Sequence, residues 1–300
     1  MKFGLRARLP KIPRERLAQI SKVRVKSPDR NKNLDQQVDQ ELLAARFRRD
    51  GFVVIKRVLT EAQCDSLVAR LAQELDPLVG PVEFEADVGY PGAPTDRSEP
   101  GGETPRRLLH AYARGQEFRD LAESAKVTNL VRFLLGEGIR LTQCHHNCVM
   151  TKYPGFSSAT AWHQDVRYWS FDTPDLITAW IALDREERTK GALRVLPKSH
   201  QLELDRGRLD KNLFLRTECP ENKQLIRQAQ EIELDGGDVL LFHARLFHAA
   251  GKNLTETPKF SVVFSYHGES NLPIPGTRSA TLPSLSIESE TTPPDIVNER

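Results

Sequence analysis

The sequence predicts an α+β protein whose second half is a β-sandwich or barrel. Before Gly136, apolar residues recur mainly at helical spacing. After Gly136, short runs rich in β-branched and aromatic residues are separated by turn residues. Helices followed by many short strands favour this class. With 300 residues, of which 39% are hydrophobic, the chain can bury one sizeable core or at most two modest ones.

The first half of the chain contains three predicted helices and one strand. Helical spacing from Leu34 to Ala45 predicts a helix that stops near Gly51, and residues 52–55 predict a short buried strand. Thr60 begins a second helix, because Thr60 and Gln63 match a capping box. A third helix is predicted over 117–135, after a loop at 89–105 that is rich in Gly and Pro. A loop of that length is usually a functional lid or disordered.

The second half contains the predicted strands, which are short and separated by turns. From residue 272 the chain is rich in Pro, Ser and Thr, which predicts an extended or partly disordered tail. We therefore expect an arm over 1–33, a folded domain over 34–271 and a tail over 272–300. The strands are expected at 139–141, 147–153, 161–166, 177–182, 193–196, 231–234, 239–242 and 260–266.

The charge of the chain is unevenly distributed. Its formal net charge is only +2, which excludes a nucleic-acid binder that relies on overall basicity. Residues 1–30 nevertheless carry ten Lys or Arg and two acids, so the remainder of the chain is mildly acidic. Apolar residues interleave with these cations, which suits contact with anionic lipid. A basic flexible tail without a partner is the alternative, and an organelle transit peptide is disfavoured by Pro10 and Pro13.

The sequence predicts a cytoplasmic protein, peripheral at the inner membrane face if the arm binds lipid. No apolar run is long enough to span a membrane, and charges stand where a signal peptide needs apolar residues. The four cysteines form no CxxC pair. Reduced thiols in a cytosolic core are favoured over a zinc site at Cys144 and Cys148, because no second ligand pair follows at zinc spacing.

The most informative stretch is Trp162-His163-Gln164-Asp165. Alternate residues of a strand project to the same face, so the side chains of His163 and Asp165 can converge on one point. One imidazole and one carboxylate are two of the three ligands of a facial triad for non-haem Fe(II). The third ligand has to be a histidine from elsewhere in the chain, and His243 and His248 are the two candidates.

Several segments along the chain share one order and spacing with a known family. They are the opening at 50–54, the helix from Thr60, Trp162-His163-Gln164-Asp165, Trp180-Ile181-Ala182-Leu183, 191–200, 237–243 and 248–253. Together these segments resemble the phytanoyl-CoA dioxygenase family, over roughly residues 40–268. This resemblance implies a double-stranded β-helix of the jelly-roll or cupin-like type, with the N-terminal helices packed on it. It also implies Fe(II), 2-oxoglutarate as co-substrate and O2.

The resemblance also implies roles for individual residues. His163, Asp165 and His248 would be the iron ligands, because the family places its distal histidine just before a small-residue segment that ends in Asn, here 249–253. The family binds the far carboxylate of 2-oxoglutarate with an Arg eleven residues after that histidine. Lys259 stands there in this chain; it supplies the charge without the bidentate fork, unless it is a solvated lysine at a strand start. Trp180 and Thr160 are further candidate contacts of the co-substrate.

The same resemblance favours hydroxylation, because relatives that halogenate replace the carboxylate of Asp165 with a small residue. Arg167, Tyr168 and Trp169 flank the metal strand and are candidate substrate contacts, and Arg245 and Arg278 add possible contacts with an anion. The alternative for each is a solvated or loop-stabilising side chain.

The predicted substrate is an anionic small molecule or lipid-linked sugar. The stretches 147–152 and 162–171 are similar to bacterial hydroxylases of the Kdo sugar in lipid A precursors. A hydroxylase of an acyl-CoA, a carrier-bound molecule or another small metabolite is one alternative. A non-catalytic, cupin-like ligand-binding protein is the alternative from another class.

Overall fold

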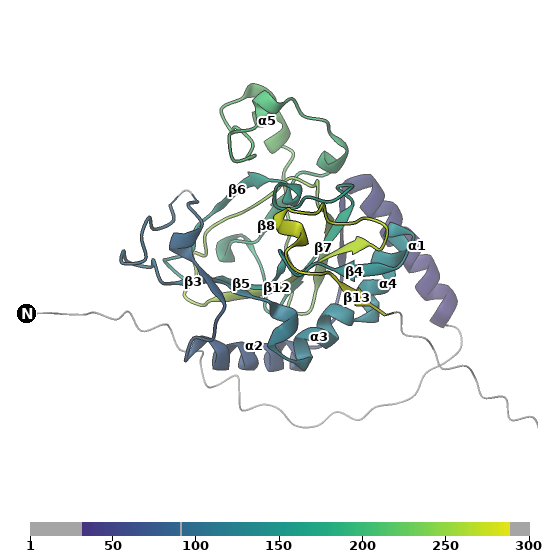
Figure 1. The fold of residues 1–300 in the computed structure, drawn as a ribbon, viewed down its shortest axis with the longest axis horizontal. Helices are drawn as coiled ribbons and strands as arrows, with labels where there is room; N and C mark the ends of the chain where they lie inside the picture. The colour runs from purple at the N-terminus through teal and green to yellow at the C-terminus, as the bar shows by residue number, and fades with distance from the viewer. Residues whose placement is uncertain (1–31, 91, 289–300) are drawn as a thin grey trace, which may run out of the picture.

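The computed structural model describes residues 32–90 and 92–288, and it confirms the predicted α+β class as a jelly roll of two antiparallel sheets covered by helices (Figure 1). The predictions made for residues 1–30 lie outside the described residues. The helices are α1 (Lys32–Asp50), α2 (Glu61–Leu75), α3 (Gln116–Glu123), α4 (Ala125–Leu135) and α5 (Pro220–Ile226).

Within the described chain, nine strands form the larger sheet, in the order β1-β10-β7-β12-β5-β3-β2, with β4 paired to β12 and β13 paired to β4. The smaller sheet has the order β6-β11-β8-β9. Strands of the larger sheet are β1 (Phe52–Ile55), β2 (Val82–Phe84), β3 (Pro105–Leu109), β4 (Ile139–Leu141), β5 (Asn147–Lys152), β7 (Leu176–Ala182), β10 (Val239–His243), β12 (Lys259–Gly268) and β13 (Leu285–Ile287). Strands of the smaller sheet are β6 (Thr160–His163), β8 (Leu193–Val195), β9 (Gln230–Glu231) and β11 (His248–Ala250).

Apolar side chains pack against both faces of the larger sheet. Because successive residues of a strand point to opposite faces, the fully buried strand β12 contributes to both cores. Its Val262 and Phe264 pack with the helices, in the same cluster as Phe118 of α3. Its Val263 packs between the sheets, together with Trp180 of β7. Every residue of β12 is therefore buried, including the charged Lys259.

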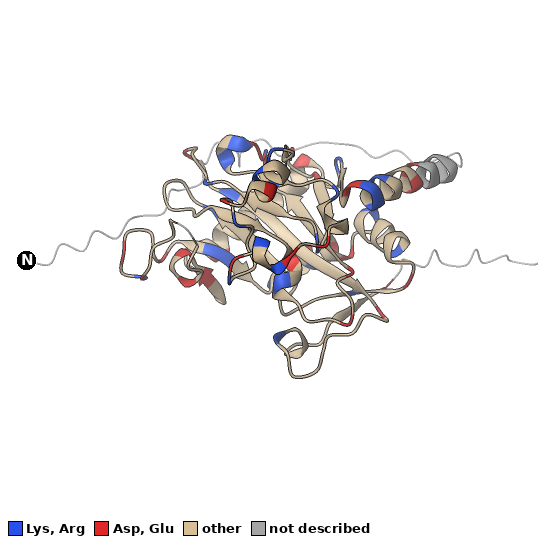
Figure 2. Cartoon of the chain, turned by 90° about the horizontal axis from the view of Figure 1, so that it is seen from above, with Lys and Arg blue, Asp and Glu red and all other residues tan. Residues whose placement is uncertain are grey.

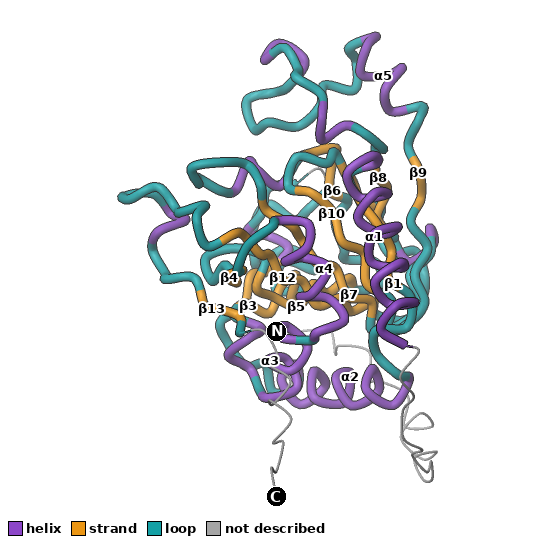
Figure 3. The backbone as a smooth tube through the Cα atoms, turned by 90° about the vertical axis from the view of Figure 1, so that its right-hand side faces the viewer, coloured by secondary structure: helices purple, strands orange, loops and turns teal. Residues whose placement is uncertain are grey.

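The helices cover the larger sheet on one side of the molecule. Figures 1 and 3 both place α2 and α3 along this side, and α5 at the opposite end, in a long excursion between β8 and β9. Lys and Arg are interspersed with Asp and Glu along the described chain (Figure 2). None of the described helices has the length and apolar character that crossing a membrane requires.

The local signals for the first helices and strands predict the structure well. Strand β1 has the predicted bounds, and α2 has Thr60 as its N-cap. The Thr60 hydroxyl accepts a hydrogen bond from the Gln63 backbone N–H, and the Gln63 side chain accepts one from the Thr60 backbone N–H at 2.9 Å. This reciprocal pair satisfies two N–H groups that a helix start leaves unpaired, and it fixes where α2 begins.

The predicted single helix over 117–135 is two helices in the structure, α3 and α4. They meet at Ser124, whose backbone is not helical (φ −50°, ψ 117°). In α3 the buried residues include Leu121 and Ala122, and in α4 they start at Val127. An unbroken helix would place its next buried position three or four residues after Ala122. The break at Ser124 restores the phase, so that both helices turn apolar faces to the sheet.

Three strands of the larger sheet lie outside the predicted strands: β2, β3 and β13. Residues 88–90 and 92–104 form a loop, whereas the loop was predicted over 89–105; Pro105 begins β3, which pairs with both β2 and β5. The segment predicted as an extended tail packs against the body up to residue 288. Its strand β13 pairs with β4, with Ile287 opposite Ile139.

Candidate metal centre

Two histidines face each other across the smaller sheet. His163 ends β6 and His248 begins β11, and these residues are direct partners in the antiparallel pairing of the two strands. Their ring centroids lie 4.2 Å apart. Directly opposed residues of antiparallel strands have neighbouring side chains on the same face. The pairing register thus brings together two imidazoles that are 85 positions apart in the sequence.

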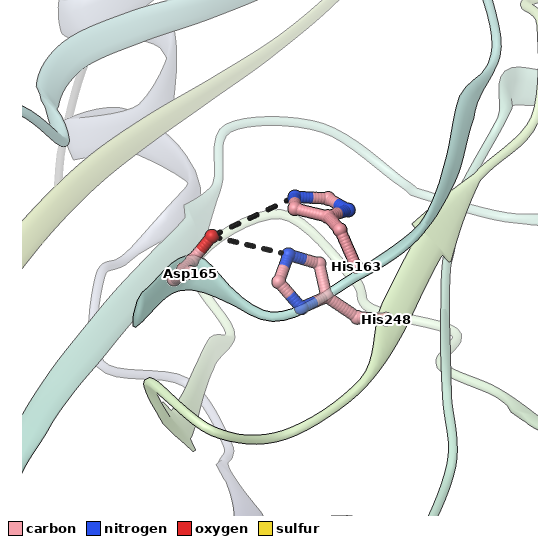
Figure 4. A group of neighbouring side chains, drawn as sticks. All are labelled: His163, Asp165 and His248. Atoms are coloured by element: carbon pink, nitrogen blue, oxygen red, sulfur yellow. Dashed lines mark ion pairs between the residues drawn. The ribbon is translucent and has the colours of Figure 1, made fainter. Parts of the chain in front are cut away.

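Asp165 joins the two histidines through a turn and not through the strand. The prediction of a strand over 161–166 is corrected here, because β6 ends at His163 and residues Asp165–Tyr168 form a 3-10 helix, η4. The turn brings Asp165 Oδ1 to 3.7 Å from His163 Nε2 and 3.4 Å from His248 Nε2, as Figure 4 shows. One ligand atom from each residue lies within 4.8 Å of the others.

The free atoms of this cluster fit a metal ion. His163 Nδ1 lies 2.9 Å from the Ala161 carbonyl oxygen, and His248 Nδ1 lies 3.0 Å from that of Leu246. A carbonyl only accepts, so both Nδ1 atoms carry the proton and each Nε2 keeps its lone pair for a metal ion. Asp165 Oδ1 is buried and has no hydrogen-bond partner among the described residues. Two imidazoles and one carboxylate are the donor set of a facial triad.

The other carboxylate oxygen of Asp165 is held by neighbouring side chains. Thr178 Oγ1 on β7 donates to Asp165 Oδ2 at 3.2 Å, and His146 Nδ1 lies 3.2 Å from the same oxygen. Burial opposes ionisation of Asp165, but His146 and His248 outweigh it and hold the pKa of Asp165 well below its usual range. Burial, followed by the charge of His248, lowers the pKa of His163 well below its ordinary value. An ionised carboxylate and a neutral imidazole are the forms that bind metal.

A cavity between the two sheets opens onto these three side chains. Besides His163, Asp165 and His248, its lining includes two residues predicted as co-substrate contacts, Thr160 and Trp180. The remaining lining residues are Tyr90, Arg106, Arg107, His146, Met150, Lys152, Tyr168, Thr178, Leu193, Phe242, Ala250 and Val263.

Three cations line this cavity that the sequence interpretation did not identify: Arg106, Arg107 and Lys152. Arg106 donates to Glu85 Oε2 at 3.1 Å and to Thr160 Oγ1 at 3.1 Å. The guanidinium of Arg107 makes no hydrogen bond within the described chain, and its Nε lies 3.4 Å from Glu83 Oε1. The pairing of β3 with β5 brings Arg106 and Arg107 to the cavity. This pairing could not be predicted, because the sequence did not indicate a strand at β3.

Lys259 lies beside the cavity in a buried ion pair. Its Nζ is 2.7 Å from Glu186 Oε2, and both side chains are almost completely buried. Glu186 also accepts hydrogen bonds from Trp180 Nε1 at 3.0 Å and from Ser261 Oγ at 2.5 Å. Lys259 is thus buried and paired and not a solvated lysine, but it is not among the residues that line the cavity.

Aromatic residues from three segments meet where Tyr168 lines the cavity. Tyr168 Oη lies 2.9 Å from Tyr90 Oη, in the loop over 88–104. The ring of Tyr90 contacts Phe214, from the excursion that carries α5, with ring centroids 5.9 Å apart. Arg167 stacks over Phe214 at 4.0 Å. Through Tyr90, the loop therefore contacts Tyr168, which lines the cavity beside the candidate metal ligands.

The other candidate residues lie apart from the metal-ligand cluster. Trp169 lines a second, separate cavity. Arg245 forms an ion pair with Glu203 at 2.6 Å, and Arg278 is exposed in the 3-10 helix η8 (Arg278–Ala280). His243, the alternative third ligand, accepts a hydrogen bond from the Arg245 backbone N–H, and its Nε2 lies 3.3 Å from Asp175.

Residues 47–261 match the protein family described as phytanoyl-CoA dioxygenase (PhyH). Relatives include a probable alpha-ketoglutarate-dependent hypophosphite dioxygenase from Stutzerimonas stutzeri, 27% identical over 57% of this chain. The ectoine dioxygenase of Sphingopyxis alaskensis is 25% identical over 76%. The matches span 60% of the length of the former and 76% of the latter.

Solved structures share the fold. The alpha-ketoglutarate-dependent epimerase SnoN from nogalamycin biosynthesis superposes with a TM-score of 0.65 at 24% identity, covering 85% of this chain and 97% of its own. The Fe-bound ectoine enzyme EctD from S. alaskensis superposes with a TM-score of 0.65 at 20% identity, covering 82% and 85%. At these identities the likeness establishes the jelly-roll fold alone. The chemistry of the site has to be argued from its own residues.

We predict that Asp165→Ala lowers the affinity for Mn(II), used as an air-stable probe ion, at least about 100-fold. Loss of an outer-shell partner alone typically costs 10- to 100-fold, and this change removes a ligand. The measurement is isothermal titration of the apoprotein. His243→Gln is the matched control, because His243 is another late histidine outside the cluster, and it should bind as the wild type does. An unchanged affinity in Asp165→Ala would contradict the assignment of the centre.

Proposed function

The chain belongs to the phytanoyl-CoA dioxygenase family, a family of Fe(II)- and 2-oxoglutarate-dependent oxygenases, and we propose that it hydroxylates a small anionic substrate with Fe(II), 2-oxoglutarate and O2. The observation that carries this proposal is the buried cluster of His163, Asp165 and His248 at the wall of a cavity. A pure binding protein has no need of all three side chains at one point.

Different residues of the cavity would have different roles in such a reaction. His163, Asp165 and His248 would hold Fe(II), and when bound the metal supplies the redox chemistry that couples oxidative decarboxylation of 2-oxoglutarate to substrate oxidation. Thr178 and His146 orient the carboxylate of Asp165. Asp165 would hold the metal through a carboxylate oxygen, and the presence of this carboxylate favours hydroxylation over halogenation. The apolar lining, with Trp180 and Phe242, limits the water that reaches the centre.

The charge of the cavity supports an anionic substrate. Arg107 is only 7% exposed, lines the cavity and makes no hydrogen bond to any described residue. A buried cation without a full complement of partners is costly, and an anionic ligand relieves that cost. Tyr90 and Tyr168 line the same cavity as Arg107, and their hydroxyl oxygens lie 2.9 Å apart. We assign the acidic group of the substrate to Arg107.

Within this class we propose Kdo of lipid A precursors as the substrate. A cavity lined by a guanidinium and by two phenol hydroxyls suits an acidic sugar, which presents a carboxylate together with hydroxyl groups. The relatives named above act, by their names, on hypophosphite and ectoine, so small polar substrates occur on this fold. An acyl-CoA is the second candidate substrate, because the human peroxisomal phytanoyl-CoA dioxygenase is 30% identical over 37% of this chain.

Turnover of 2-oxoglutarate tests the proposed function. Purified protein with Fe(II), O2 and 2-oxoglutarate should form succinate and hydroxylated product in equal amounts when given a Kdo-bearing lipid A precursor. Asp165→Ala should form neither, because it lacks a metal ligand. An acyl-CoA is the parallel substrate arm. Absence of succinate above background with every candidate, together with unchanged metal affinity in Asp165→Ala, would favour the cupin-like binding protein instead.

Arg107 should determine the affinity for the acidic group. Arg107→Gln removes a charge-assisted hydrogen bond, typically worth about 1.5–3 kcal/mol, so KM for the anionic substrate should rise about 10- to 100-fold. Initial rates of succinate formation measure this, at saturating 2-oxoglutarate. Arg245→Gln changes an arginine whose partner is the surface residue Glu203 and should leave KM unchanged. A KM that stays at the wild-type value in Arg107→Gln would refute the assignment.

The basic arm is proposed as a peripheral contact with the anionic inner membrane face. Its ten cations and interleaved apolar residues suit such a surface, at about 1 kcal/mol per cation near the lipid. Deleting residues 1–30 should therefore strongly reduce co-sedimentation with vesicles that contain anionic lipid. Vesicles of neutral lipid alone are the control and should sediment neither form. Equal sedimentation of the full chain and the deletion would dispose of membrane contact through the arm.

A further inference from the structure

Five charged side chains are buried in or beside the wall of the cavity, on β3, on β5, at the start of β12 and in two connecting segments. Arg106, Lys152 and Lys259 are cations, Glu85 and Glu186 are carboxylates, and none is more than 3% exposed. The group as a whole thus carries one more positive than negative charge. An unbalanced buried charge is strongly disfavoured unless a ligand compensates for it.

Two of the three cations already have a carboxylate. Arg106 forms an ion pair with Glu85 at 3.1 Å, and Lys259 forms one with Glu186 at 2.7 Å. Lys152 has no carboxylate within ion-pair distance among the described residues. When all five groups are ionised, the excess charge therefore belongs to Lys152. Burial lowers the pKa of Lys152 well below the ordinary lysine value, with Arg106 and Lys259 acting in the same direction, so a bound anion would favour its ammonium form.

The ammonium group of Lys152 is held in place and keeps one free proton. It donates to the Ser158 carbonyl oxygen at 3.0 Å and to the Gly251 carbonyl oxygen at 2.6 Å. A lysine ammonium has three N–H donors, so the third remains available to a ligand. Lys152 lines the cavity that reaches the metal-ligand cluster, whereas Lys259 and Glu186 do not. Thr160 and Arg106 line the cavity as well, linked by a hydrogen bond of 3.1 Å.

We propose that Lys152, and not Lys259, binds the far carboxylate of 2-oxoglutarate. This inference rests on the proposed function, because it assumes that 2-oxoglutarate is the co-substrate. One carboxylate would neutralise the excess charge of the buried group and accept the free N–H of Lys152. At Lys259 the same carboxylate would share one ammonium with Glu186, whose oxygens are already engaged by Trp180 and Ser261. Two carboxylates on one buried ammonium repel each other.

Binding of two matched acids tests the role of Lys152. 2-Oxopentanoate has the same carbon chain as 2-oxoglutarate but ends in a methyl group in place of the far carboxylate. Isothermal titration with Mn(II)-loaded protein should show that Lys152→Met weakens 2-oxoglutarate binding about 10- to 100-fold. The affinity for 2-oxopentanoate should change little. Lys152→Gln, which keeps amide donors for the two carbonyls, should give the same result, and Lys152→Arg should retain a preference for 2-oxoglutarate.

The control is the double variant Glu186→Gln/Lys259→Met, which removes the neighbouring ion pair without leaving an unpaired charge. It should still prefer 2-oxoglutarate to 2-oxopentanoate. Loss of that preference in the double variant but not in Lys152→Met or Lys152→Gln would assign the carboxylate to Lys259 and overturn the inference. Equal weakening of both acids in the two Lys152 variants would also overturn it, as a purely structural role predicts. Wild-type protein that binds neither acid would instead contradict 2-oxoglutarate as the co-substrate.

Discussion

The antiparallel pairing of β6 with β11 is the constraint on which the candidate centre depends. It places His163 opposite His248, and the carbonyls of Ala161 and Leu246 then fix both rings through Nδ1. A slip of one residue in this register would turn one imidazole to the other face of the sheet. The packing of the smaller sheet against the larger one therefore preserves the donor set as well as the hydrophobic core.

The interior between the sheets has to combine apolar packing with several ionised groups. The structure meets this demand by pairing cations with carboxylates from distant parts of the chain, as in Arg106 with Glu85 and Lys259 with Glu186. Trp180 contributes to both requirements, because its ring packs in the core while its N–H donates to Glu186. Buried charges of this kind are tolerated when their remaining hydrogen bonds are satisfied, which is why Lys152 and Arg107 stand out.

Local sequence signals predicted most of the elements, since helix caps and strand runs are encoded by neighbouring residues. The structure joins His163, Asp165 and His248 in one cluster, as the family resemblance implies. Strand alternation wrongly predicted that Asp165 lies on a strand, whereas it begins the 3-10 helix η4. No local signal in the sequence marks the end of β6 at His163. Arg107 and Lys152 were missed for a different reason: their importance depends on which distant carboxylates lie nearby, and a single sequence does not state that.

The contact between Tyr90 and Phe214 joins two surface segments beside the cavity. The candidate metal ligands His163, Asp165 and His248 lie on the strands of the smaller sheet or directly beside them. Tyr90 and Phe214 come instead from the loop at 88–104 and from the excursion that carries α5. Surface segments tolerate insertion and replacement far better than paired strands do. Replacements in these two segments can therefore change the residues next to the cavity while His163, Asp165 and His248 keep their positions.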